Sequence, residues 1–165
     1  MTTNERPATR VALICGSRSD LETLEQGAAL LAQLGVAHET RVISAHRAPR
    51  LLDRYVADAP GRGIRVFICA AGLAAHLAGA VAARTPYPVI GLPMPGGVSD
   101  GLDALLSTVQ MPPGVPVATV GVGNARNAAL LAAQILALAD DGLAQRVAAF
   151  REDQTRRVEQ DPANA

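Results

Sequence analysis

Val42-Ile43-Ser44-Ala45-His46-Arg47-Ala48-Pro49 is the stretch that indicates the fold most directly, because an apolar run ends here and a helical pattern begins. Pro49 stands in the first turn of that pattern, where a helix tolerates proline best. In an α/β protein, such a strand-to-helix corner lies at the carboxyl end of the sheet, where ligands bind. Ser44, His46 and Arg47 in this corner suit proton exchange and anion binding. A capping serine with two solvated neighbours is the alternative interpretation.

Further apolar runs of strand length lie on both sides of this corner and alternate with helical patterns. The expected strands cover residues 11–15, 37–43, 65–70, 88–92 and 116–120. The expected helices cover residues 21–34, 50–59, 71–84, 102–109, 124–139 and 143–158. The alternation predicts an α/β fold with three layers, in which helices cover a parallel five-stranded sheet of flavodoxin-like order 2-1-3-4-5. The last helix is an addition at the C-terminus.

The 165 residues are enough for one domain with a substantial core. We expect residues 1–9 to form a flexible tail, residues 10–140 the α/β domain, and residues 141–165 a C-terminal helix and tail of the same domain. The helix at 125–139 is apolar on nearly every face, which favours burial by a neighbouring subunit and therefore a homo-oligomer. The charged helix that follows is a second candidate for contact with a partner.

Composition argues against several classes of partner. Hydrophobic residues make up 49% of the chain, aromatic residues 2%, and the formal net charge is zero, so we expect no nucleic-acid binding. We do not expect the polar N-terminus to be a signal peptide, and no apolar run is long enough to span a bilayer. Cys15 and Cys69 form no CxxC pair, and we interpret them as buried, reduced thiols of a cytoplasmic protein. A catalytic thiol at Cys15 is the alternative.

Gly16-Ser17-Arg18-Ser19-Asp20 joins the first expected strand to its helix. Glycine permits a tight turn, and free amides with two hydroxyls suit a phosphate, while Asp20 suits sugar hydroxyls. A helix start capped by Ser19 is the alternative. The motif is neither GxGxxG nor GxxxxGK[ST], so a dinucleotide or ATP is not expected.

The remaining polar residues exclude other chemistry. His76 lies among alanines, where a packed core histidine is a more common interpretation than a functional one, and His38 is expected to be structural or solvated. The three histidines lack HxxxH spacing and nearby cysteine ligands, so no metal site is predicted. No serine lies in a GxSxG motif, which argues against hydrolysis. The residues together indicate proton transfer on a small phosphorylated ligand.

Five motifs in order resemble the PurE family of N5-carboxyaminoimidazole ribonucleotide mutases. They are GSRSD at 16–20, SAHRAP at 44–49, AGLAAHLAG at 71–79, GLDALLSTVQMPPGVPVATV at 101–120 and NAALLAAQIL at 127–136. The resemblance covers about residues 10–140 and implies a flavodoxin-like octamer that acts in the cytoplasm, in purine (IMP) biosynthesis. The implied reaction moves a carboxylate from N5 to ring carbon C4 of an aminoimidazole ribonucleotide, and it uses no metal or organic cofactor.

The same resemblance implies roles for individual residues. His46 would be the general acid/base, Ser19 and Arg47 would lie near the phosphate, and Ser44 would lie against the ribose. Substrate binding is also implied for Ser17, Asp20, Ala71, Gly72, Leu73 and His76. In the implied mechanism, the imidazole protonates N5 as carbon dioxide leaves. Carbon dioxide stays in a dry pocket walled by residues 70–75, C4 attacks it, and the imidazole removes the C4 proton.

The chain also departs from the usual family pattern. Ala48, Leu73 and Ala78 stand where threonine, glycine and proline are usual, segment 123–127 is short, and loop 95–100 is unusual.

Two alternatives stay open at this point. The first is the class of the same family that carboxylates aminoimidazole ribonucleotide directly with carbon dioxide. That class typically lacks the AAHL histidine and often has lysine after the catalytic histidine, so His76 and Arg47 favour the mutase. The second is a nucleotide-binding module without catalysis.

Overall fold

The computed structural model describes residues 10–164 and contains one five-stranded parallel sheet with the order β2-β1-β3-β4-β5. The strands are β1 (Val11–Cys15), β2 (His38–Val42), β3 (Val66–Ala71), β4 (Val89–Pro93) and β5 (Ala118–Thr119). The predicted fold class and strand order are therefore confirmed. The expected flexible tail at residues 1–9 lies outside the described residues.

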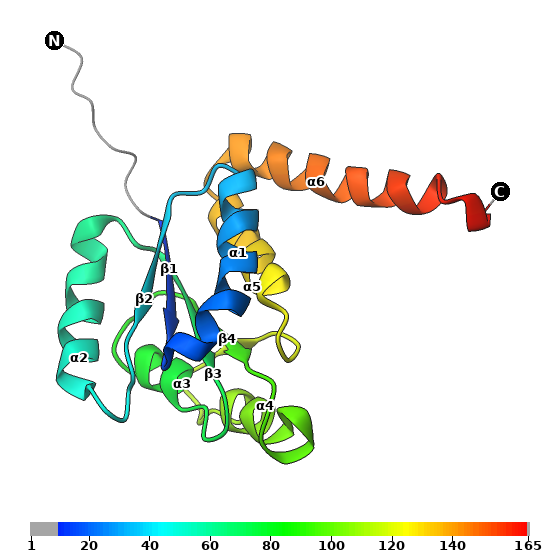
Figure 1. The fold of residues 1–165 in the computed structure, drawn as a ribbon. Coiled ribbons are helices and arrows are strands. Elements are labelled where there is room, and N and C mark those ends of the chain that lie inside the picture. The colour runs from blue at the N-terminus through cyan, green and yellow to red at the C-terminus, as the bar shows by residue number, and fades with distance from the viewer. Residues whose placement is uncertain (1–9, 165) are drawn as a thin grey trace, which may run out of the picture.

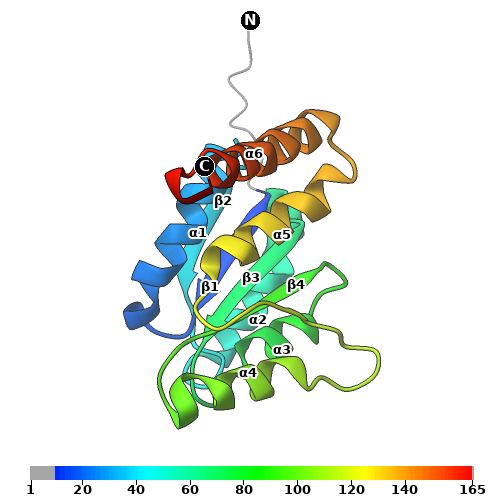
Figure 2. The same cartoon turned by 90° about the vertical axis from the view of Figure 1, so that its right-hand side faces the viewer.

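Helices cover both faces of the sheet (Figures 1 and 2). They are α1 (Leu21–Gln33), α2 (Pro49–Asp58), α3 (Leu77–Ala82), α4 (Leu102–Val109), α5 (Ala125–Ala137) and α6 (Asp141–Glu159). Helices α1 and α5 pack on one face, whereas α2 and α3 pack on the other, beside α4. Short 3-10 turns cover Arg18–Asp20, Ala59–Arg62, Val98–Asp100 and Pro162–Asn164.

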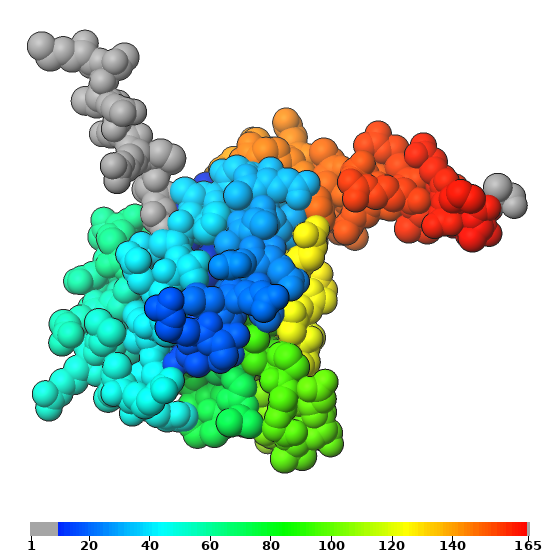
Figure 3. All heavy atoms as spheres, in the orientation of Figure 1, coloured from blue at the N-terminus to red at the C-terminus, as the bar shows by residue number. Residues whose placement is uncertain are grey.

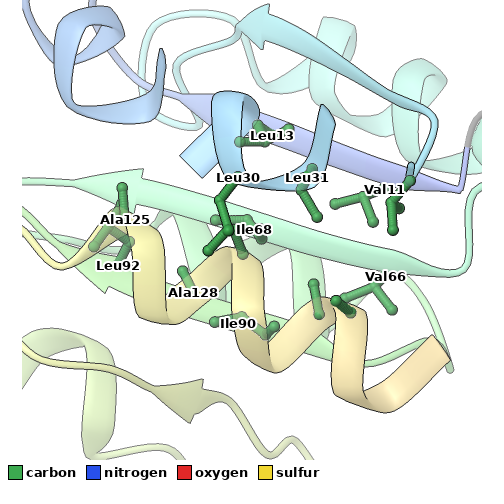
Figure 4. Close-up of a cluster of buried hydrophobic side chains, with 14 of the residues drawn as sticks. Val11, Leu13, Leu30, Leu31, Val66, Ile68, Ile90, Leu92, Ala125 and Ala128 are labelled. Atoms are coloured by element: carbon green, nitrogen blue, oxygen red, sulfur yellow. The ribbon is translucent and has the colours of Figure 1, made fainter. Parts of the chain in front are cut away.

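Strand alternation divides the core into two clusters. In β1, Val11 and Leu13 belong to the cluster under α1 and α5, whereas Ala12 and Ile14 belong to the cluster under α2 and α3. Every residue of β1 is buried, as expected for a parallel strand covered on both faces. Figure 4 shows the first cluster, in which side chains of α1, the sheet and α5 interdigitate.

Small residues let α1 and α5 approach closely. A methyl group at Gly27 in α1 would lie 2.8 Å from the carbonyl oxygen of Ala125 in α5. The α5 residues buried here are mostly alanines: Ala125, Ala128, Ala129, Ala132 and Ala133. The alanines of α5 therefore have a packing role, because their small side chains let the backbones of α1 and α5 come close together.

The predicted helix at 71–84 is wrong at its start. Ala71 is the last residue of β3, and α3 begins only at Leu77. Leu73 between them has a φ of 55°, a left-handed conformation that ends any regular helix. Residues 72–76 therefore form a loop at the carboxyl end of β3, and the run of small residues does not show where that loop ends.

The apolar faces of α5 are covered largely within the chain. Helix α5 packs against α1, the sheet and α6, so the subunit contact inferred from its composition is not required to bury it. Helix α6 begins at Asp141, earlier than predicted, because Asp140 accepts a hydrogen bond from the Leu143 amide. After Phe150, α6 projects beyond the body of the molecule (Figures 1 and 3).

Candidate active site

A cavity of about 580 Å³ opens at the carboxyl end of the sheet, between the loops that follow β1, β2, β3 and β4. Its volume suits a small ligand such as a nucleotide. The structure brings every sequence-predicted site residue to its walls: Ser17, Ser19, Asp20, Ser44, His46, Arg47, Ala71, Gly72, Leu73 and His76.

The loop after β1 forms a polar wall of the cavity. Ser17 caps the 3-10 turn Arg18–Asp20, since its Oγ accepts a hydrogen bond from the Ser19 amide at 3.4 Å. The capping alternative therefore named the wrong serine. The Ser19 hydroxyl lies 3.0 Å from Ser17 Oγ and 3.1 Å from Asp20 Oδ1, so it can donate its proton to either oxygen. These hydroxyls and this carboxylate can exchange their mutual contacts for contacts with a ligand.

Arg47 connects the loops after β1 and β2. One of its terminal Nη2–H groups donates to the Gly16 carbonyl at 2.6 Å, and its Nε–H donates to Ser44 Oγ at 3.3 Å. Ser44 Oγ also accepts the Arg47 amide at 3.2 Å, so the serine orders the turn. The guanidinium has five N–H groups, and those not engaged here can receive an anion.

His46 and His76 are in direct contact across the cavity. His46 Nε2 lies 2.8 Å from His76 Nδ1, and the rings meet edge to face at 87°. Both side chains are exposed, so the packed-core alternative for His76 is wrong. A contact of this length requires that one of the two facing nitrogens carries no proton, because two N–H groups repel. In this contact one ring nitrogen donates its proton and the other accepts it.

Apolar residues form another part of the cavity wall. Sequence reasoning missed Leu77, Met94 and Pro95, which line the cavity beside Leu73. Met94 and Pro95 follow β4 directly, and the Met94 amide donates to the Ala71 carbonyl at 2.9 Å. The rule that ligands bind at the carboxyl ends of parallel strands would have found them, had it been applied to every strand.

Neither cysteine lines the cavity. Both are free and buried, which confirms that part of the prediction. Burial is the main cause that raises the pKa of Cys15 to about 11, and the Asp20 carboxylate raises it further. Burial also raises the pKa of Cys69. A thiol with so little thiolate at neutral pH makes a poor nucleophile, which argues against the catalytic alternative for Cys15.

Between Arg10 and Asn164, no cluster of three histidine, cysteine or acidic side chains has the geometry to hold a metal ion. Across the same span, none of the helices combines the length and the apolarity that crossing a bilayer needs.

Comparison with known proteins identifies the family. The family model of AIR carboxylase matches residues 10–157. The N5-carboxyaminoimidazole ribonucleotide mutase of Mycobacterium tuberculosis is 53% identical over 148 residues, which cover 90% of this chain and 84% of that protein. The mutase of Saccharolobus solfataricus is 51% identical, with 87% of this chain and 91% of that protein covered.

Two further similarities concern a longer relative and a solved structure. The chloroplastic phosphoribosylaminoimidazole carboxylase of Vigna aconitifolia is 50% identical over 92% of this chain, which spans 27% of that protein's length. The crystal structure of Treponema denticola PurE superposes with a TM-score of 0.85 at 29% identity, covering 93% of this chain and 96% of that one. On the matched model and these identities, this chain belongs to the AIR carboxylase family.

Proposed function

We propose that this protein is an N5-carboxyaminoimidazole ribonucleotide mutase that converts N5-carboxyaminoimidazole ribonucleotide into 4-carboxyaminoimidazole ribonucleotide in purine (IMP) biosynthesis. The reaction is an isomerisation within one substrate. Relatives that carry this name share about half of the chain's residues over most of their length. The PurE fold of the T. denticola protein supports the same assignment.

The contact between His46 and His76 is the observation that carries the proposal. The isomerisation needs one group that gives a proton to N5 and then takes a proton from C4. An imidazole can give a proton and then take one near neutral pH. His76 lies 2.8 Å from His46, close enough to form a hydrogen bond with it while the proton on His46 is given up and regained. We assign His46 as the general acid/base and His76 as its partner at the substrate.

The remaining polar residues are assigned to binding. Arg47 faces the cavity with N–H groups left for the phosphate, and Ser19 stands beside it on the β1 loop. Ser17 and Asp20 suit the sugar and ring, because a carboxylate accepts hydrogen bonds from hydroxyl and amino groups. Ser44 contacts the ribose in this arrangement. Ala71, Gly72 and Leu73 form the wall that the reacting carboxylate faces.

These assignments give a mechanism in two steps. The imidazolium of His46 protonates N5 while the N5–carboxyl bond breaks, so neutral carbon dioxide forms next to the ring. C4 then attacks carbon dioxide, and the imidazole removes the proton that C4 carried. The histidine ends in its starting state, because His46 gives the proton that N5 gains and receives the proton that C4 loses.

The Vigna relative favours one alternative, direct carboxylation of aminoimidazole ribonucleotide by carbon dioxide, because its name describes that reaction. The two reactions differ in the origin of the carboxyl carbon. Substrate labelled with ¹³C in its N5-carboxylate is incubated with the protein in excess unlabelled bicarbonate. A mutase places the label in the C4 product, whereas product that forms only with added bicarbonate, and without label, identifies the carboxylase.

We also propose a homo-oligomer, with the octamer as the expected state. The support is a stripe on α4 in which Leu102, Leu106 and Val109 are 44%, 45% and 49% exposed at helical spacing. Light scattering coupled to gel filtration tests this: a mass of eight chains supports the octamer, and a monomer contradicts it. A cytoplasmic location is proposed from the two buried free thiols, which a reducing compartment preserves.

A further inference from the structure

We propose that Arg18 attracts the anionic substrate to the cavity through its charge, so that it raises kcat/KM and leaves kcat unchanged. This inference rests on the proposed function and adds a residue that controls substrate entry. Arg18 begins a 3-10 turn in the β1 loop, and its neighbours Ser17, Ser19 and Asp20 all line the cavity. The Arg18 side chain is exposed and is not part of the lining. The chain therefore places a cation on the turn that forms the polar wall, without using it to build that wall.

The charge of the lining does not balance the charge of the proposed substrate. Asp20 and Arg47 are the only lining residues with a permanent charge, and their charges cancel. The substrate has a phosphate, with a charge of about −1.5 to −2 at pH 7, and an ionised carboxylate. A protonated His46 compensates only one of these negative charges. A guanidinium beside the lining therefore supplies positive potential that the cavity itself lacks.

Nothing in the described part of the chain uses the charge of Arg18. The side chains of Ser17, Ser19 and Asp20 are connected by hydrogen bonds, whereas the Arg18 guanidinium forms no hydrogen bond or ion pair with any described residue. The turn leads directly into α1, which begins at Leu21. A cation near the amino end of a helix is disfavoured by the helix dipole. Helix α1 therefore gains nothing from this arginine, and the cavity is where its charge acts.

A charge outside the wall acts over a distance that salt controls. The screening length is about 30 Å at 0.01 M salt, about 10 Å at 0.1 M and about 3 Å at 1 M. A charge at the edge of a binding site mainly changes how fast a charged ligand arrives, and this change falls as salt rises. The proton transfers at His46 take place after binding, so they do not depend on Arg18.

The test measures kcat/KM and kcat between about 0.01 M and about 1 M salt for the wild type, R18Q, R18K and R151Q. R151Q is the matched control, because it removes the same charge. Arg151 is exposed on α6, which lies at the opposite end of α1 from the β1 loop (Figures 1 and 2). At the lowest salt we expect R18Q to lower kcat/KM about three- to tenfold, with kcat unchanged. The loss should disappear at the highest salt, and R18K and R151Q should match the wild type.

Three results would overturn the inference: an R18Q protein that equals the wild type at low salt, a loss in R18Q that is the same at every salt concentration, or an equal loss in R151Q. Failure of the proposed function looks different, because the wild type itself would then not convert N5-carboxyaminoimidazole ribonucleotide. Calorimetric titration with aminoimidazole ribonucleotide tests Arg18 even then, since this ligand keeps the phosphate and its binding needs no turnover. R18Q should bind it more weakly than the wild type at low salt and equally at high salt.

Discussion

The sheet face under α1 and α5 and the carboxyl edge of the same sheet are built in contrasting ways. Under α1 and α5, side chains are buried, small residues let backbones approach, and β1, β3 and β4 follow the expected alternation (Figure 4). At the carboxyl edge, Leu73, Ser99 and Asp100 adopt positive φ, and histidine, arginine and serine side chains stand exposed. Stability and activity therefore reside in separate parts of this molecule, because unusual backbone conformations and exposed polar side chains gather where ligands bind.

The sharpest test of this separation is H46N. We expect kcat to fall on the order of 10²–10⁴-fold, because the proton donor is lost, while nucleotide binding and thermal stability stay unchanged. Steady-state kinetics with calorimetric binding measures both. H38N is the matched control, because His38 lies on β2, outside the cavity, and bonds the Val36 carbonyl. Activity retained in H46N would remove the catalytic assignment of His46, whereas a wild type that binds the nucleotide without turnover would support the binding-module alternative.

R47Q tests whether the edge binds substrate through charge. Removing a charge-assisted contact to a phosphate should raise KM about 10–100-fold, with a much smaller change in kcat. R50Q is the control, because Arg50 is exposed on the first turn of α2 and does not line the cavity. If R47Q lowers the melting temperature without changing KM, then the bond from Arg47 to the Gly16 carbonyl is structural and the separation fails at this residue.

G27A addresses the packed face. The added methyl would lie 2.8 Å from the Ala125 carbonyl oxygen, so α1 and α5 must move apart. Overpacking of this kind should lower the free energy of unfolding by about 1–3 kcal/mol, while kcat stays within twofold of the wild type. Denaturant unfolding provides the measurement. G61A is the control, since a methyl group there meets nothing within 4 Å and should be nearly neutral. A loss of activity at unchanged stability would couple the two regions.

The sequence predicts the first region better than the second, for a physical reason. Apolar runs such as Val11–Cys15 are enough to define buried parallel strands, and their order follows from the alternation with helices. The sequence also identifies the motif residues at the carboxyl edge, because hydroxyl, imidazole and guanidinium groups directly after parallel strands indicate ligand binding. Their geometry was not predictable. The start of α3 depends on the backbone of Leu73, and the His46–His76 contact joins loops 30 residues apart.

Composition was least informative about α5. Its alanines and leucines are equally suited to contact with a subunit and to contact with α1 and α6, and the structure shows the intramolecular packing. Periodicity reports which faces are apolar and says nothing of what covers them. By contrast, the exposed stripe on α4 became visible only once the positions of Leu102, Leu106 and Val109 were known.

The smallest effect is expected from D140N, at the amino end of the sheet, far from the site. The Leu143 amide, and after it the Arg10 guanidinium, lower the pKa of Asp140 from its ordinary value of 3.8. A lowered folded-state pKa stabilises the protein above the unfolded value, and this stabilisation is lost as pH falls through the folded value. Asparagine still caps α6 but carries no charge.

D140N should therefore melt slightly lower than the wild type at pH 7, and the difference should shrink as pH falls below the ordinary value of 3.8 toward the lower folded-state pKa of the wild-type carboxylate. Melting curves from pH 7 to pH 3 measure this, and kcat at pH 7 should be unchanged. D153N is the control, because Asp153 is bridged by Arg156 and Arg157 on the projecting part of α6. If D140N changes kcat and leaves the melting temperature untouched, the amino end of the sheet influences catalysis, and the assignment of stability and activity to separate regions is wrong.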